Sequence, residues 1–122
     1  MAWKFEGNSP LTVQIADRLR RDIIDGVYPM GSDFPAVRAL AYEAAVNPNT
    51  MQKALVILES EGLLITHGTT GRVVTTDAEV ISLARVRVRE DFVKKTVNEA
   101  LLLGIEPEQL CEDIFNATVA NW

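Results

Sequence analysis

The feature that most constrains this chain is a helix whose two ends are both marked in the sequence, between Asn47 and Gly62. Asn47 can cap the first free amides of a helix, and Pro48 fits the first helical position, where its missing N–H costs nothing. Gly62 suits the left-handed residue that ends many helices. Val46 and Met51 have the spacing of a hydrophobic staple, which would fix the angle at which the chain enters this helix.

This helix is predicted to have one buried face and one polar face. Helical spacing places four apolar residues inward: Met51, Ala54, Leu55 and Leu58. The outer face has one cation and no acid, and it consists of Asn49, Thr50, Gln52, Lys53 and Val56. Asn and Gln can pair bidentately with adenine, while Thr and Lys reach phosphate or guanine. An ordinary solvated helix face is the alternative interpretation, so the neighbouring segments have to decide.

Two more helices are predicted before this one. Ser9 caps and Pro10 begins the first, which ends at Gly26. Its arginines are expected to pair with nearby acids more often than with phosphate. Residues 27–33 are typical of a tight, ordered turn, and residues 36–43 form the next short helix. Two helices joined this closely, the second with a polar N-terminus, indicate a helix-turn-helix unit.

Beyond Gly62, two β-prone runs surround a loop bounded by glycines. Residues 63–67 and 72–75 enclose Gly68-Thr69-Thr70-Gly71, which predicts a β-hairpin, or wing. Arg72 beside the loop suits a phosphate or the minor groove, although an exposed arginine without a partner is nearly as common. His67 is the only histidine of the chain, so a metal site or a catalytic dyad built on it would lack a second member. We interpret His67 as a wing residue near nucleic acid or as simply exposed.

Residues 76–122 predict two helices that need a partner. Thr76-Asp77-Ala78-Glu79 has capping-box spacing and begins a long helix that Gly104 ends, and Glu106-Pro107 begins the last helix. The remaining chain is too short to cover their apolar surface, so a second subunit is the economical partner. The residues expected at this dimer interface are Ile81, Ala84, Val88, Phe92, Leu110, Ile114 and Phe115.

Composition narrows the class of protein. A chain of 122 residues with 48% hydrophobic content can fold as one small domain with an appendage. The formal net charge is −5, but residues 1–75 hold seven basic and eight acidic side chains, so most of the acid lies beyond the proposed reading unit. Phosphate binding would have to come from the arrangement of charges rather than from their excess.

Neither catalysis nor membrane insertion is expected. The chain has one His and one Cys, no Ser-His-Asp or metal-spaced cluster and no phosphate-cradling glycine loop. We therefore expect no enzyme, catalytic residue, metal or cofactor. Apolar runs are short, no signal pattern is seen, and Cys111 cannot form an internal disulfide, which together favour a cytoplasmic protein with no membrane partner.

An ordered set of positions between residues 9 and 75 carries a resemblance to a known family. It includes Pro10-Leu11, Gln14-Ile15-Ala16, Leu19-Arg20, Gly26, Pro29, Gly31, Phe34-Pro35, Val37-Arg38, Leu40-Ala41, Val46-Asn47-Pro48-Asn49-Thr50, Ala54-Leu55, Leu58 and Glu61-Gly62-Leu63. In this order they resemble the GntR family of bacterial transcription regulators. The short tail with its Gly-x-x-Pro break is similar to the YtrA-like subfamily. The resemblance implies a nucleoid-associated repressor that dimerises through its C-terminal helices and binds a palindromic operator.

The resemblance also implies which residues contact DNA. They are Arg38 on the helix before the recognition helix, Asn47, Asn49, Thr50, Gln52 and Lys53 on the recognition helix, and His67, Gly68 and Arg72 on the wing. This chain departs from the family's pattern at several positions. Ala36 and Ala39 replace a capping Ser and Glu, and Pro48 and Gln52 stand near positions where many relatives have arginine. Val56 and Ile57 are apolar where relatives are usually polar.

The expected fold is therefore mainly α with a small β-hairpin. A winged helix-turn-helix domain, residues 1–75, would precede a C-terminal helical dimerisation region, residues 76–122. The leading hypothesis for function is a homodimeric repressor on double-stranded operator DNA. The alternative is a winged-helix protein-interaction module with little DNA affinity, motivated by the acidic balance. One further hypothesis places a small-molecule effector of unknown identity between the C-terminal helices and the winged domain.

Overall fold

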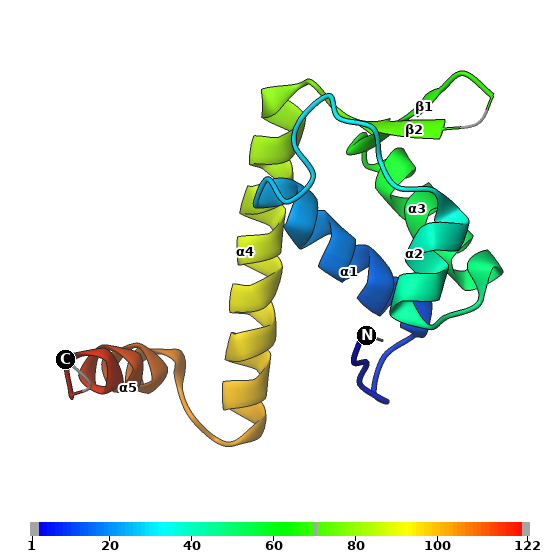
Figure 1. Ribbon diagram of the computed structural model, residues 1–122. Coiled ribbons are helices and arrows are strands. Elements are labelled where there is room, and N and C mark those ends of the chain that lie inside the picture. Colours follow the sequence, from blue (N-terminus) through cyan, green and yellow to red (C-terminus); the bar gives the residue numbers. More distant parts are fainter. Residues whose placement is uncertain (1–2, 70, 121–122) are drawn as a thin grey trace. The chain divides into compact units, whose positions relative to one another are not determined.

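A computed structural model describes residues 3–69 and 71–120 of the chain, and it confirms the mainly α fold with a two-stranded hairpin (Figure 1). Thr70 of the predicted wing loop lies outside the described residues. The elements, in chain order, are α1 (Leu11–Ile24), α2 (Val37–Ala44), α3 (Pro48–Ser60), β1 (Leu64–His67), β2 (Gly71–Val74), α4 (Ala78–Leu102) and α5 (Pro107–Ala120).

The chain divides into two compact units, Met1–Arg85 and Val86–Trp122. We expected a boundary after residue 75, whereas the units divide inside α4. The physical reason is burial, because Ile81 and Ala84 lie in the core of the first unit and Val80 packs against that core. The first turns of α4 therefore belong to the winged domain. In the second unit Ala100 is buried, while none of the described residues of α5 is.

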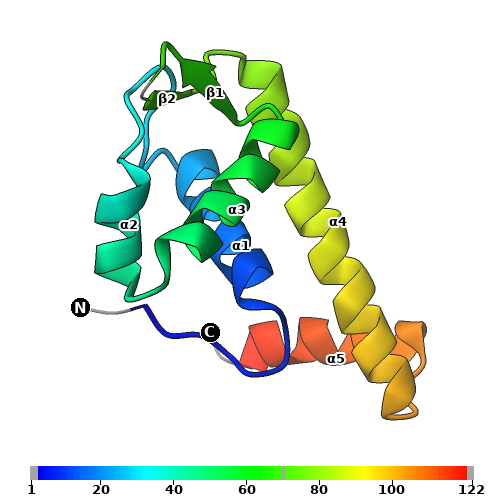
Figure 2. The same cartoon turned by 90° about the vertical axis from the view of Figure 1, so that its right-hand side faces the viewer.

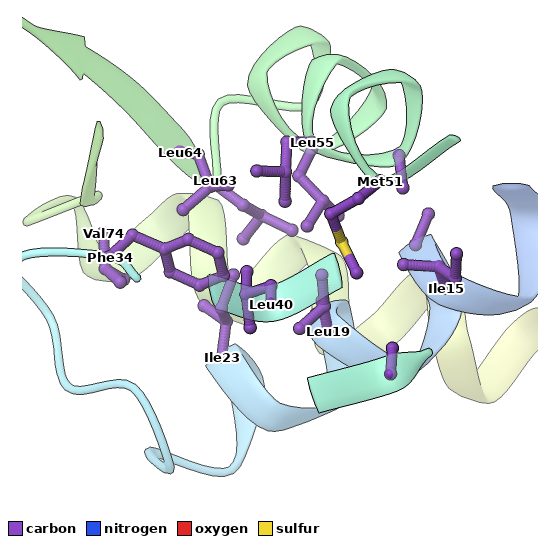
Figure 3. Close-up of a cluster of buried hydrophobic side chains, with 14 of the residues drawn as sticks. Ile15, Leu19, Ile23, Phe34, Leu40, Met51, Leu55, Leu63, Leu64 and Val74 are labelled. Carbon is purple, nitrogen blue, oxygen red and sulfur yellow. The ribbon is translucent and has the colours of Figure 1, made fainter. Parts of the chain in front are cut away.

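The core of the first unit joins three helices and the hairpin. In α1, apolar side chains four residues apart (Ile15, Leu19 and Ile23) are buried on one face. Both α1 and α2 pack against α3 (Figure 2). Figure 3 shows these side chains meeting residues from the other elements in one cluster: Phe34, Leu40, Met51, Leu55, Leu63, Leu64 and Val74. This cluster fixes α3 against the rest of the domain.

The beginning of α1 differs from the prediction that Ser9 is its cap. Pro10 is the N-cap residue, no side chain caps the helix, and the helix begins at Leu11. The Gln14 side chain holds the preceding segment instead. Its Oε1 accepts a hydrogen bond from the Glu6 amide at 2.8 Å, and its Nε2 donates to the carbonyl oxygens of Glu6 at 2.7 Å and Ser9 at 2.8 Å. The prediction that Ser9 caps α1 was wrong. The backbone of Ser9 is held instead by Gln14, a residue inside the helix.

The cap of α4 also differs from the prediction. Asp77 Oδ1, rather than Thr76, accepts a hydrogen bond from the Glu79 amide at 2.9 Å. Thr75 Oγ1 accepts from the Asp77 amide at 3.1 Å, so two successive side chains satisfy the backbone at this turn. A buried Thr75 between β2 and α4 shifts the cap by one residue, and the predicted capping box is not formed.

Two helix ends show how the helix-turn-helix is shaped. Gly62 after α3 has a φ of +79°, and the Leu63 amide donates to the Leu58 carbonyl at 3.1 Å, as expected for a glycine-ended helix. At the end of α2 the left-handed position is instead taken by Ala45, with a φ of +58°. This is the only positive φ of a non-glycine residue in the described ranges 3–69 and 71–120. The turn between α2 and α3 is therefore conformationally costly.

The wing has a third backbone segment that the sequence did not predict. In the hairpin, Leu64 pairs with Val74 and His67 with Gly71. The segment before α2 lies along β2, since the Val74 amide donates to the Ser32 carbonyl at 3.0 Å and the Phe34 amide to the Arg72 carbonyl at 2.8 Å. Residues 27–33 are thus an ordered link, as expected, but one whose end supports the wing.

Candidate nucleic-acid interface

The N-terminus of α3 is built as the sequence predicted. Asn47 has extended backbone angles, Pro48 follows at the first helical position, and Asn47 Oδ1 accepts a hydrogen bond from the Asn49 amide at 2.7 Å. Because the cap uses this oxygen, the side-chain NH₂ of Asn47 is the group left to meet a ligand. Asn47 therefore has a structural role that the resemblance alone does not give it.

The two faces of α3 are also confirmed. Met51, Ala54, Leu55 and Leu58 are buried. Asn49, Gln52 and Lys53 are exposed and Thr50 is half-buried, with no acidic residue in the first turn. Val56 and Ile57, the two apolar residues that depart from the family's pattern, differ in burial. Ile57 packs against the core, whereas Val56 is exposed. The exposed surface of α3 is thus neutral-polar with one cation, and Val56 lies within it.

Arg38 is exposed on α2, the helix that packs against α3. Ala36 is the N-cap residue of α2, and no side-chain hydrogen bond caps this helix. The absence of a capping Ser is thus visible in the structure as an uncapped first turn. The Arg38 guanidinium, beside that turn, is sterically available to a ligand.

Arg72 was expected either to contact a phosphate or the minor groove or to be exposed without a partner. The structure shows a third arrangement, a pair within the fold. Arg72 is half-buried and pairs with Glu59 of α3, through Nε at 2.9 Å and Nη2 at 2.8 Å from Oε1. Thr66 Oγ1 of β1 donates to the other carboxylate oxygen of Glu59. Hydrogen bonding from Thr66, and then the Arg72 guanidinium, holds the pKa of Glu59 below its usual value. Sequence reasoning missed this pair because its members stand 13 residues apart on different elements.

His67 and Gly68, the other two wing residues expected to contact DNA, are exposed. His67 ends β1 opposite Gly71, and Gly68 follows with a φ of +66°. A left-handed residue at this position allows the tight start of the loop. The structure therefore brings together the recognition helix and the wing, and it leaves His67 and Gly68 accessible.

A second ion-pair cluster joins α1 to the end of α3. Arg20 donates through Nε and Nη2 to both carboxylate oxygens of Glu61, each at 2.7 Å, and through Nη1 to Asp17 at 2.7 Å. The predicted pairing with a nearby acid is confirmed for Arg20, whose pKa is raised chiefly by its hydrogen bond to Glu61. Arg18 instead lies over the Trp3 ring at 4.1 Å. These arginines are occupied within the fold.

The residues expected at a dimer interface fall into two groups. Ile81 and Ala84 are buried in the core of the winged domain, which corrects their assignment to a second subunit. They face that core because α4 begins directly after the wing. Val88 and Leu110 are half-buried, whereas Phe92, Ile114 and Phe115 are exposed, with exposed fractions from 52% to 69%. The second unit therefore carries three of these seven side chains exposed.

Within residues 3–69 and 71–120, no group of three or more His, Cys, Asp and Glu side chains could hold a metal ion. Over the same part of the chain, no helix combines the length and the hydrophobicity needed to cross a bilayer. Cys111 is exposed and free.

Comparison with known proteins places this geometry among transcription regulators. Residues 11–74 match the family described as bacterial regulatory proteins, gntR family. The chain is 26% identical over 111 residues to the uncharacterized HTH-type transcriptional regulator YhcF of Bacillus subtilis, covering 91% of this chain and 92% of YhcF. It is 28% identical over 106 residues to the HTH-type transcriptional repressor YtrA of the same organism, covering 86% and 82%.

The structural comparison agrees with the sequence matches. A GntR family transcriptional regulator from Listeria monocytogenes superposes with a TM-score of 0.81 at 28% identity, covering 92% of this chain and 98% of that one. The family match runs from the start of α1 to the end of β2. It therefore covers all of the winged helix-turn-helix elements described above.

Proposed function

The chain belongs to the GntR family of bacterial transcription regulators and carries its DNA-binding winged helix, and from this premise we propose that it is a repressor that binds a palindromic operator as a homodimer. The observation that carries the proposal is the exposed, acid-free N-terminal face of α3. The relative YtrA, named a transcriptional repressor, aligns with most of this chain. Family membership also favours this function over the protein-interaction module.

The recognition helix enters the major groove in this proposal. Asn49 and Gln52 are exposed amides suited to adenine, and Lys53 beside them suits guanine or phosphate. Thr50 and the Asn47 NH₂ lie nearer the backbone of the DNA. Arg38 contacts a phosphate from α2, which fixes the register of the helix on the duplex.

The wing contributes from the neighbouring groove. His67 and Gly68 are exposed at the end of β1 and approach the sugar-phosphate backbone. Arg72 acts mainly through its pair with Glu59, which ties β2 to α3 and so sets where the wing tip lies. A direct phosphate contact by Arg72 would require it to exchange Glu59 for the phosphate.

A second copy of the chain covers the exposed apolar side chains of the second unit. Phe92, Ile114 and Phe115, together with Leu102 and Val119, are each more than half exposed. Burial of such residues stabilises an association by about 1.5–3 kcal/mol for each fully covered side chain. Two-fold pairing would present two recognition helices about 34–36 Å apart, one turn of the duplex.

An effector site is proposed within the first unit. A cavity of about 410 Å³ lies between the end of α1, the loop that follows it and the first turns of α4, with Ile23, Ile24, Met30 and Arg85 among its walls. Arg85 Nη2 donates to the Ile24 carbonyl at 3.0 Å. Calorimetry with a metabolite panel tests this site, using Ser82→Trp to fill the cavity as the control.

The repressor proposal is tested with DNA from upstream of the protein's own gene. Fluorescence anisotropy at two salt concentrations should show tight, salt-sensitive binding that prefers this duplex to a scrambled one, at two subunits per site. Arg38→Ala should weaken binding to both duplexes, whereas Arg21→Ala, an exposed arginine on α1, should not. Equal affinity for both duplexes would contradict the proposal.

The dimer is tested separately by sedimentation. Phe115→Asp should shift the chain toward monomer, because a charge would then be buried in the apolar interface. Asn116→Asp, exposed on the opposite side of the same helix, is the control. A wild-type chain that sediments as a monomer at micromolar concentration would argue against a homodimer. A repressor acts on the bacterial chromosome, so we also propose that the protein works in the cytoplasm, at the nucleoid.

A further inference from the structure

Val56 is an exposed aliphatic residue in the middle of the proposed recognition surface. Its exposed fraction is 49%, whereas the adjacent Ile57 packs against the core. A β-branched residue at an exposed helical position loses side-chain freedom and is a poorer helix former than Lys, Gln or Glu. Since Val56 adds neither core packing nor helix propensity, the stability of α3 does not explain it.

The position of Val56 associates it with the polar recognition residues. It follows Asn49, Gln52 and Lys53 by seven, four and three positions, which are the intervals that place helical side chains on one face. At 1.5 Å per residue, Val56 lies about 10 Å beyond Asn49 along the helix axis. That distance corresponds to about three base pairs at 3.4 Å each.

We propose that Val56 determines part of the operator sequence by contacting the 5-methyl group of a thymine in the major groove. The inference rests on the proposed function, because it requires α3 to enter that groove. An aliphatic side chain has no hydrogen bond to offer a base edge, and the thymine methyl is the apolar group that base pairs present there. The polar residues on the same helical face favour a nucleic acid over a protein surface at this position.

The contact is tested by removing each partner in turn. The wild-type chain first selects a duplex from a random pool, and each thymine of that duplex is then replaced by deoxyuridine, which lacks the methyl group. Anisotropy should show about a fourfold loss of wild-type affinity at one or more thymines, the value expected for one buried methyl group. Val56→Ala should lose a similar factor on the original duplex and be insensitive to deoxyuridine at those same thymines.

Val13→Ala is the matched control. Val13 is also an exposed valine on a helix, with an exposed fraction of 43%, but it lies on α1 rather than α3. This variant should bind as the wild type does and keep the full response to deoxyuridine. Equal thermal unfolding of the two valine variants would show that lost affinity does not reflect lost folding.

Two results would overturn the inference. The first leaves the proposed operator binding intact, and the second overturns it as well. If every deoxyuridine weakens Val56→Ala and the wild type equally, Val56 contacts no thymine methyl, while the proposed operator binding stands. If the wild-type chain enriches no sequence from the pool, the proposed function fails and the inference fails with it.

Discussion

Glu59 of α3 and Arg72 of β2 form an ion pair that joins the recognition helix to the wing, with Oε1 of Glu59 2.8 Å from Nη2 of Arg72. Thr66 of β1 donates to the same carboxylate, so both strands of the hairpin are held. The side chains of Arg72 and Glu59 are 16% and 24% exposed, which protects the pair from part of the screening that weakens surface salt bridges. The angle of the wing relative to α3 depends on this carboxylate.

We expect the contribution of Glu59 to stability to disappear in acid. Its pKa in the folded chain lies below the ordinary value of 4.5, first because of the Thr66 hydrogen bond. A lowered carboxyl pKa stabilises the fold above the unfolded-state pKa, and this stabilisation is lost as the pH falls through the folded-state pKa. Glu59→Gln should therefore cost about 1 kcal/mol at pH 7 and progressively less as the pH falls below the ordinary carboxyl pKa of 4.5. Thermal unfolding of both chains across this range measures it, and a constant difference would contradict it.

Arg20 should be coupled to Glu61 more strongly than a surface arginine is to its neighbours. The pair is bidentate and partly buried, with side chains 17% and 27% exposed. A double-mutant cycle with Arg20→Met and Glu61→Gln should give a coupling energy of about 1–2 kcal/mol in urea unfolding. Arg20→Lys should recover only part of it, because an ammonium group cannot bind both oxygens as a fork. Additive effects of the two substitutions would show that the pair is not coupled.

Ala45→Gly should stabilise the helix-turn-helix. Ala45 has a φ of +58° and a ψ of +48°, a conformation that costs a residue with a Cβ about 1–2 kcal/mol. Glycine relieves this strain but has a larger entropy of unfolding, so we expect a net gain of about 0.5–1 kcal/mol. Ala44→Gly, one residue earlier and inside α2, should destabilise by about 1 kcal/mol. A lower midpoint in urea for Ala45→Gly would contradict the prediction.

Substitutions of Asn47 should separate capping from DNA binding. Asn47→Ala removes the bond to the Asn49 amide and should cost about 1 kcal/mol of stability. Asn47→Asp keeps an oxygen at the cap and adds favourable charge at the helix N-terminus, so stability should hold. Its charge would repel phosphate, so affinity for the operator should fall. Unfolding and anisotropy measured on the same two variants check this, and unchanged affinity for Asn47→Asp would place Asn47 away from the DNA.

Several features of this protein follow from the sequence alone because their signals are local. Asn47, Pro48 and Gly62 mark the ends of α3 within its own residues, and the buried stripe of this helix follows from its 3.6-residue period. The hairpin follows in the same way from two β-prone runs around a glycine-bounded loop. The family match over residues 11–74 spans these same elements.

The tertiary structure decided what joins these elements. It paired Arg72 with Glu59 and Arg20 with Glu61, placed the segment before α2 along β2, and buried Ile81 and Ala84 in the winged domain. It also separated Ile57, which packs inward, from Val56, which stays exposed. Local spacing assigns a residue to a helix or a strand, but the partner of a charge or an apolar side chain depends on which distant element packs beside it. Which elements pack together depends on the whole core, so these partners cannot be assigned from local spacing.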